Sequence, residues 1–433
     1  MKGNTGTSVP SMGFILWFSL GFILGCPGED EPDPPEVFDE IDWSDDAFEF
    51  DVQWSDQATV IGEDQMSVVL EADTEEHVYR FNAAGVNEAG IPLAAGRILV
   101  IHGTALRLIE DVEESEGQLI LSTDDAALTD AIDQGVIEWD YGVELSSDYV
   151  QALTPDGQPV AMQQGDTVEF EEEVDGYTLV FELALQGDHA TFDARAEREG
   201  VAFVASGTIM RFRSRDRIVI EEGELQEYDN RFEHVRADLE LEYEVDEAGQ
   251  DFVDFTFPAP LLEHRFLVGY LPVQVDLDLQ FIINRLLSSG GRSQVGGSFV
   301  FDSDLGFLVR QGEVEGDGGL DAVEMESETF GSGGASPIAI EFGFGFPRMG
   351  LQLFDYPVVP WTQVTSMVGG TFDVFPPCET ADQQLSGSGA IDLSLFGLQE
   401  ELEDSTFFGV DEVLLRSGGC PDDSSAPFSL TPR

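Results

Sequence analysis

The stretch Leu271–Ile282 reads LPVQVDLDLQFI and decides the fold class. Every second residue is apolar, and most residues between them are polar or acidic. Successive side chains of a β-strand point to opposite faces, so this alternation predicts one long strand that is buried on one side. The apolar face holds Val273, Val275, Leu277, Leu279 and Phe281, and the polar face holds Gln274, Asp276, Asp278 and Gln280.

The same alternation returns along the chain, and helical periodicity is rare. Asp238–Val245 reads DLELEYEV, and turn sequences such as Ser289–Gly291 separate the strand-like runs. Short helices are expected only at Ala126–Ile132 and Gln399–Glu403. We therefore predict an all-β protein of antiparallel sheets or sandwiches, with long strands and very little helix.

Acidic residues dominate the charge of the chain. The sequence carries 86 Asp and Glu against 19 Lys and Arg, a formal net charge of −67. Such a surface repels nucleic acid and anionic lipid, so no nucleic-acid partner is expected. Two explanations of the acidity stay open, a saline habitat in which salt screens the charges and a bias in codon usage.

A short uncharged segment lies near the N-terminus. Phe14–Gly25 reads FILWFSLGFILG, which is well short of the roughly 20 residues of a membrane-spanning helix and is typical of a signal peptide. Ile23–Cys26 (ILGC) resembles the lipobox of bacterial lipoproteins. The resemblance implies a lipoprotein signal peptide at residues 1–25 and a lipid, such as palmitate, on Cys26 that binds the membrane.

The same resemblance implies a location. A lipid-anchored protein of this kind lies in the bacterial cell envelope, on a periplasmic or surface face that stays open. Pro27 stands where an aspartate favours retention in the inner membrane, so the outer membrane is the expected site. Residues 26–55 are rich in acids and proline, which extend a chain, and are expected to form a tether.

Three β-rich units are expected after the tether. They are a domain at 56–146, a larger antiparallel domain at 147–330, and a C-terminal segment at 331–433, with a boundary at the flexible composition GSGGASP of residues 331–337. The C-terminal segment contains Cys378 and Cys420. In an exported protein this even pair predicts a disulfide.

Two segments are similar to parts of uncharacterised β-rich bacterial surface proteins. The first is Arg97–Val136, where a strand pair precedes the pattern T-x-x-A-x-L-x-x-A-I-x-x-G, and the second is Gly269–Val275, which reads GYLPVQV. The resemblance implies a fold dominated by sheets and carries no activity.

An alternating row of arginines stands out in MRFRSRDRI. If this segment is a strand, the side chains lie on one face at a spacing of about 6.6–6.8 Å. The row could bind a polyanion, such as a sulfated or phosphorylated envelope glycan. The favoured alternative is structural, with the row paired across the sheet to the acidic row Asp238, Glu240, Glu242 and Glu244. The arginines of the row are Arg211, Arg213, Arg215 and Arg217.

Oxygen ligands for a structural Ca²⁺ occur in two segments. EGDGGLDAVE contains Asp317, Asp321 and Glu324, and FDSDLG contains Asp302 and Asp304. Calcium takes 6–8 oxygen ligands, but neither segment has the spacing of an EF-hand. Solvated acidic loops are the favoured alternative, and no other cofactor is expected.

The sequence identifies no catalytic residue. It has no G-x-S-x-G motif and no P-loop, and its histidines lack the spacing of a zinc site, so each is expected to be an ordinary surface or strand residue. They are His77, His102, His189, His234 and His264. Ile338–Phe346 (IAIEFGFGF) has an aromatic face that is expected to pack in a core, though such a face could also contact sugars or lipid.

The leading hypothesis is therefore a lipid-anchored cell-envelope protein with a structural or binding role, whose glycan or protein partner is unknown. A secreted carbohydrate-active or other hydrolase that uses Asp and Glu is one alternative, because catalytic groups assemble in space and need no local motif. A carrier of apolar ligands in the Phe-rich interior is another.

Overall fold

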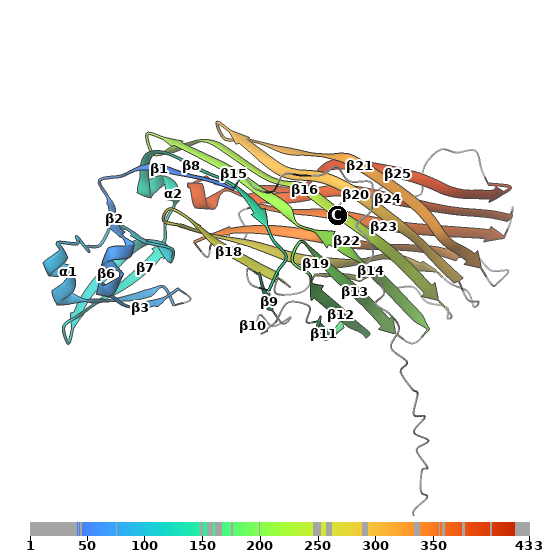
Figure 1. Ribbon diagram of the computed structural model, residues 1–433, viewed down its shortest axis with the longest axis horizontal. Helices are drawn as coiled ribbons and strands as arrows, with labels where there is room; N and C mark the ends of the chain where they lie inside the picture. Colours follow the sequence, from blue (N-terminus) through green and yellow to red (C-terminus); the bar gives the residue numbers. More distant parts are fainter. Residues whose placement is uncertain are drawn as a thin grey trace, which may run out of the picture. The chain divides into compact units, whose positions relative to one another are not determined.

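The all-β prediction is confirmed. The computed structural model is 78% strand and 7% helix, with large antiparallel sheets (Figure 1). It describes residues 41, 43, 46–74, 76–147, 150–153, 159–160, 167–174, 176–198, 200–245, 253–256, 262–287, 293–332, 338–354, 356, 360–374, 377–398 and 401–420. Cys26, the expected signal peptide and most of the expected tether lie outside the described residues.

Within the described ranges, one sheet has ten strands. Its order is β1-β8-β15-β16-β14-β13-β12-β11, with β20 also paired to β16 and β21 paired to β20. The strands are β1 (Ala47–Trp54), β8 (Ile132–Val143), β11 (Thr167–Val174), β12 (Tyr177–Leu185), β13 (His189–Arg198), β14 (Val201–Met210), β15 (Phe212–Glu221), β16 (Glu224–Val245), β20 (Ser293–Arg310) and β21 (Glu313–Ser332).

A second sheet has nine described strands in the order β10-β9-β18-β19-β22-β23-β24-β25, with β17 paired to β19. The strands are β9 (Val150–Leu153), β10 (Pro159–Val160), β17 (Val253–Thr256), β18 (Leu262–Val268), β19 (Leu271–Leu287), β22 (Ile338–Leu353), β23 (Pro360–Val374), β24 (Pro377–Asp392) and β25 (Glu401–Gly418). The short turn η2 (Ser394–Phe396) precedes β25. This sheet therefore joins strands from both sides of the boundary expected at 331–337.

Aromatic side chains fill the space between these two sheets. Phe203 of β14 lies against Phe342 of β22, with ring centroids 4.8 Å apart. Phe192 of β13 contacts Phe344 and Phe346 of β22, at 5.5 Å and 4.6 Å. All three β22 rings are fully buried, which confirms a core position for the described part of the aromatic face predicted in Ile338–Phe346. Burial of each such ring removes a large apolar area from water and stabilises the sandwich-like arrangement.

A smaller sheet has six described strands in the order β2-β5-β6-β7-β4-β3. They are β2 (Ala58–Ile61), β3 (Val69–Asp73), β4 (Val78–Asn82), β5 (Ile98–Ile101), β6 (Ala105–Ser115) and β7 (Gln118–Asp125). The helical turn η1 (Glu63–Val68) and helix α1 (Ala83–Ala89) belong to the same region, and this sheet has a core cluster of its own. Tyr356 joins the region to the larger core, because its hydroxyl donates to the carbonyl of Ala126 at 2.7 Å.

The short helix expected at Ala126–Ile132 is present as α2 (Leu128–Ala131). The one expected at Gln399–Glu403 is wrong where the structure describes it, because Glu401–Gly418 is strand β25. The expected tether also contains a strand, since β1 occupies Ala47–Trp54 at the edge of the ten-stranded sheet.

Strand β19 confirms the alternation of Leu271–Ile282, but its polar face is less exposed than the pattern suggests. Gln274 is 9% exposed and Asp276 is 6% exposed. Asp276 accepts hydrogen bonds from the amides of Gln274 and Gln352, at 2.8 Å and 2.5 Å. Burial raises the pKa of Asp276 to about 7.

Cys378 and Cys420 form the predicted disulfide. Cys378 lies on β24 opposite Gly418 at the end of β25, so the bond closes the end of a strand pair. A covalent link of this kind stabilises the fold mainly by restricting the unfolded chain.

Candidate functional site: the outer face of the ten-stranded sheet

Strand β15 divides its residues between two very different faces. Phe212, Ser214, Asp216, Ile218 and Ile220 are buried and point toward the core. The alternate positions point to the other side, which we call the outer face, and they carry the arginine row. One strand of ten residues therefore places a row of arginines and a row that faces the core only one residue apart.

Three arginines of the row have carboxylate partners on neighbouring strands. Arg213 contacts Asp140 of β8 at 2.6 Å. Arg215 contacts Glu233 of β16 at 3.4 Å. Arg217 lies between Glu138 of β8 and Glu227 of β16, at 3.2 Å and 2.5 Å. These ion pairs support the structural interpretation of the row, since a polyanion would have to displace the carboxylates.

The partners are not the acidic row that the sequence suggested. Register is the reason, because β15 pairs with the first half of β16, from Glu224 to Glu233. The row Asp238–Glu244 lies further along β16, where its neighbours are β14 and β20. The expected pairing between the two rows is therefore wrong, although both rows lie on or next to the same strand pair.

Arg211 lies just before β15 and has a different environment. Its guanidinium stands 4.3 Å above the centroid of the Trp43 ring, a cation–π contact. Burial lowers the pKa of Arg211, and the nearby carboxylates of Asp188 and Glu144 oppose the change. The four arginines thus do not present four equivalent cationic groups to a ligand.

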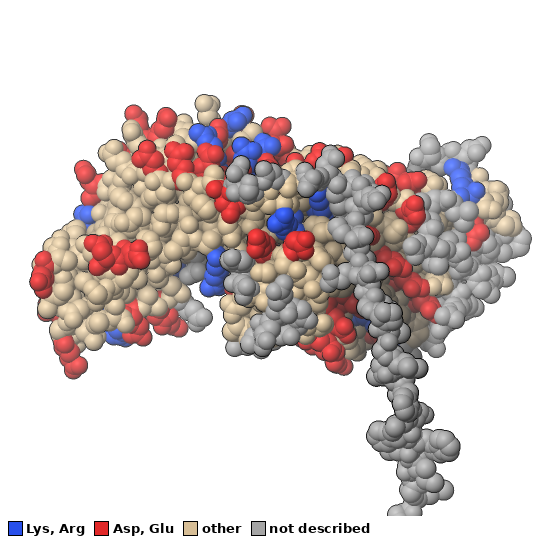
Figure 2. Space-filling model, in the orientation of Figure 1, with Lys and Arg blue, Asp and Glu red and all other residues tan. Residues whose placement is uncertain are grey.

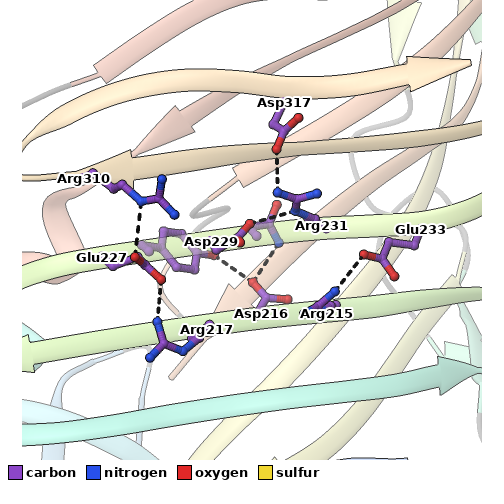
Figure 3. A network of polar contacts seen from close by, with 11 residues as sticks. Arg215, Asp216, Arg217, Glu227, Asp229, Arg231, Glu233, Arg310 and Asp317 are labelled. Atoms are coloured by element: carbon purple, nitrogen blue, oxygen red, sulfur yellow. Dashed lines mark hydrogen bonds and ion pairs between the residues drawn. The ribbon is translucent and has the colours of Figure 1, made fainter.

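The ion pairs continue across β16 to β20 and β21 (Figure 3). Glu227 also contacts Arg310 of β20 at 3.2 Å. Arg231 contacts Asp229 on its own strand at 2.9 Å and Asp317 of β21 at 2.6 Å. Asp317, which the sequence offered as a calcium ligand, is therefore part of an ion pair. Acidic side chains outnumber basic ones over the surface in view (Figure 2).

A buried polar cluster lies directly behind this charged face. Asp216 is fully buried and accepts hydrogen bonds from Asn230 at 2.8 Å and Tyr228 at 3.2 Å. Ser214 lies 3.3 Å from the other carboxyl oxygen and accepts from the indole of Trp139 at 3.1 Å. Burial raises the pKa of Asp216 to about 8, and its three hydrogen bonds partly oppose the rise.

An open depression of about 630 Å³ lies at one end of the outer face, over β1, β8 and the β15–β16 turn. Its polar lining comes from carboxylates and amides that alternate with Val52, Val136 and Val219. The acidic and amide side chains of this groove, which we call the polar groove, are Asp51, Gln53, Gln134, Glu221, Glu222, Glu224 and Gln226. Such groups can accept from and donate to the hydroxyls of a sugar.

The middle of the outer face brings together three groups that are far apart in the sequence. One ligand atom each from His234, Asp304 and Asp321 lies within 4.8 Å of the others. Two residues of the predicted calcium segments, Asp304 and Asp321, belong to this group, one from each segment. Asp317 is paired with Arg231, and Glu324 is exposed on β21.

Asp302, the other acid of the FDSDLG segment, forms an ion pair outside this group. It contacts Arg236 at 2.7 Å, and both side chains are at least nine-tenths buried. The segments around Asp302 and Asp321 are strands, not the loops that their glycines suggested. The sequence missed His234 because it lies in neither an H-x-x-x-H nor an H-E-x-x-H arrangement.

Comparison with protein-family models gives no match to the chain. Comparisons with curated proteins and with solved structures also give none. Among the described residues, no helix has both the length and the apolar character needed to cross a membrane.

Proposed function

We propose that the protein is a lipid-anchored component of the bacterial cell envelope that binds an envelope glycan in the polar groove. The observation that carries the binding role is the groove itself, an open surface of carboxylates and amides beside a rigid sheet. The observation that supports anchoring is the ILGC sequence at Ile23–Cys26. The acidic, proline-rich sequence that follows Cys26 supports a spacer between the membrane and the sheets.

The chemistry of the groove favours a neutral, polyhydroxylated ligand. Asp51, Glu221, Glu222 and Glu224 would repel an anionic glycan, and the net charge of the chain would add to the repulsion. Gln53 and Gln134 supply both a donor and an acceptor without charge. Open polar surfaces of this kind bind weakly, so we expect dissociation constants on the order of 0.1–1 mM.

The anchoring part of the proposal is tested by membrane fractionation. The wild-type chain is expected in the membrane fraction, and Cys26→Ala is expected in the soluble fraction. Cys26→Ala retained in the membrane would contradict the lipid anchor.

The binding part is tested by titration with a neutral N-acetylglucosamine oligosaccharide, with dextran as a second neutral glycan and polygalacturonate as an acidic one. Gln53→Ala and Gln134→Ala are expected to weaken neutral binding at least about fivefold. Glu324→Gln is the matched control, because Glu324 is exposed on the same sheet away from the groove. Neutral glycans that fail to bind, or binding that both groove variants leave unchanged, would overturn the role of the groove.

A hydrolase is the second candidate, because the same groove carries four carboxylates. Glycoside hydrolases need two carboxyl groups on either side of the scissile bond. Product analysis of the titrated oligosaccharide separates the candidates, since a binding protein returns the sugar intact. Shorter products that disappear in Glu221→Gln or Glu224→Gln would favour the hydrolase.

A further inference from the structure

The geometry points to a divalent metal site on the outer face, formed by His234, Asp304 and Asp321. We propose that it takes a first-row transition ion such as Zn²⁺ and not the calcium ion that the acidic segments suggested. The three residues come from β16, β20 and β21, which are adjacent strands of the ten-stranded sheet. Their ligand atoms lie within 4.8 Å of one another.

Two irregularities in neighbouring strand pairs build this cluster. Between β16 and β20 the register moves from Phe232–Leu305 to Val235–Ser303, so Glu233 and His234 together face Asp304. Between β20 and β21 it moves from Asp302–Ala322 to Ser303–Leu320, which leaves Asp321 as the extra residue. Such bulges re-aim side chains, and they are frequent beside functional sites. Here both bulges flank the same short piece of β20.

The backbone holds the histidine in place. His234 has φ of +58°, in the left-handed region that non-glycine residues seldom adopt. Its N–H donates to Asp304 Oδ1 at 2.9 Å, which ties the two candidate ligands together. Asp304 keeps a second carboxyl oxygen that could bind an ion together with the carboxylate of Asp321.

The imidazole supplies the independent observation. Nδ1 of His234 is shielded from solvent and has no hydrogen-bond partner. Buried polar atoms in folded proteins are nearly always paired, because an unpaired one loses its bond to water without replacement. A metal ion bound through Nδ1 would give this nitrogen a partner, and the carboxylates of Asp304 and Asp321 offer ligand atoms close by.

The donor set decides the class of metal. Imidazole is a common ligand of zinc and of other transition ions, whereas Ca²⁺ prefers six to eight oxygens. Zinc binds nitrogen and oxygen at about 2.0–2.2 Å, so in tetrahedral geometry its ligand atoms lie about 3.3–3.6 Å apart. Side-chain movements of about 1.2 Å at most would bring the three atoms into that range. Three protein ligands would leave a position for water or an outside ligand, as in zinc sites that are not purely structural.

The test uses the full 433-residue chain in detergent, stripped with EDTA, dialysed and titrated with ZnCl₂ by calorimetry. We expect one equivalent of Zn²⁺ to bind, and CaCl₂ at the same concentration to give no comparable heat. His234→Asn and Asp321→Asn should each weaken Zn²⁺ binding at least about tenfold. Asp321 is exposed, so its isosteric variant is the one most certain to keep the fold, and far-UV circular dichroism without metal checks this.

Matched controls separate a built site from scattered surface binding. Glu324→Gln removes an exposed acid from the same strand, and His189→Asn removes a histidine that lies 2.8 Å from Asp188. Both should bind Zn²⁺ like the wild type. Co²⁺ gives a second readout, since an absorption band that needs His234 reports the nitrogen ligand directly.

Three outcomes would overturn the proposal. The first is no Zn²⁺ binding to the wild-type chain, and the second is equal loss in the control variants. The third is a calcium-selective site that survives His234→Asn, which would restore calcium as the ligand and remove the histidine from it.

Discussion

The two faces of strand β15 carry polar residues under opposite physical conditions. On the outer face, Arg215 and Arg217 are 52% and 41% exposed at their side chains and contact glutamates of the next strands. On the inner face, Asp216 is fully buried among neutral hydrogen-bond partners. Water screens the exposed ion pairs but cannot screen the buried carboxyl of Asp216. This one carboxyl should therefore affect stability more than several exposed ion pairs.

The pH dependence of stability gives the largest expected effect. The pKa of Asp216 is about 8 in the folded chain against 3.8 as the ordinary value, so the folded state holds the proton more tightly. This contribution is fully present below pH 4 and is lost as the pH rises through about 8. The loss should be on the order of 6 kcal/mol at most.

Urea unfolding between pH 4 and pH 9 measures this loss, and Asp216→Asn is the control because the amide cannot ionise. Three other carboxyls should also lower the stability as the pH rises, because burial raises each of their pKa values to about 7. They are Asp276, Asp278 and Asp382. The difference between wild type and Asp216→Asn isolates Asp216. If the free energy of unfolding changed equally with pH in the wild type and in Asp216→Asn, Asp216 would not be the cause.

Asp216→Ala should give the next largest effect, a loss of about 3 kcal/mol at pH 4, where ionisation of Asp216 in the unfolded chain contributes little to the comparison. It leaves Asn230 and Tyr228 without their acceptor in the core, and each unpaired buried group costs about 1–3 kcal/mol. Chemical denaturation measures the change. Asp216→Asn should keep most of the stability at the same pH, and an equal loss in both variants would contradict the hydrogen-bond explanation.

Trp139→Phe should have a moderate effect of about 1 kcal/mol. It removes the indole N–H that donates to Ser214 at 3.1 Å and keeps most of the ring volume. The double variant with Ser214→Ala tests the pair. If the hydrogen bond accounts for both losses of stability, the double variant should lose less than the sum of the two single variants.

Arg217→Met should have the smallest effect, about 0.5 kcal/mol at low salt and less at 1 M NaCl. The variant loses its contacts to Glu138 and Glu227 but keeps an aliphatic chain over the sheet. Thermal melting at the two salt concentrations measures it. A loss as large as that of Asp216→Ala would reverse the ranking of the two faces.

The alternation in Leu271–Ile282 and Ile338–Phe346 was enough to predict strands and the core rings Phe342, Phe344 and Phe346. It could not predict strand partners. The acidic row and three of the four arginines each lie on one face of a strand, as expected, but register placed Glu227 and Glu233 beside the arginines. Alternation repeats every two residues, so it is equally compatible with many registers.

The candidate sites show the same limit. The sequence pointed to Asp321 and Asp304 but placed them in separate segments, Asp321 with its chain neighbours Asp317 and Glu324, and Asp304 with Asp302. The structure brings Asp321 and Asp304 together with His234, because two bulges shift adjacent strands by a residue. The residues around His234 carry no pattern that predicts a bulge, because a bulge depends on the pairing of strands that are remote in sequence.

Composition and local pattern by themselves determined the all-β class, the acidic surface and the pairing of Cys378 with Cys420. These follow from side-chain chemistry and a two-residue period, which are local properties. The tertiary structure alone decided that Asp216 is buried with a raised pKa, that the arginine row is paired, and that His234 meets two aspartates. Each of these depends on which strands lie side by side, and long-range register sets that.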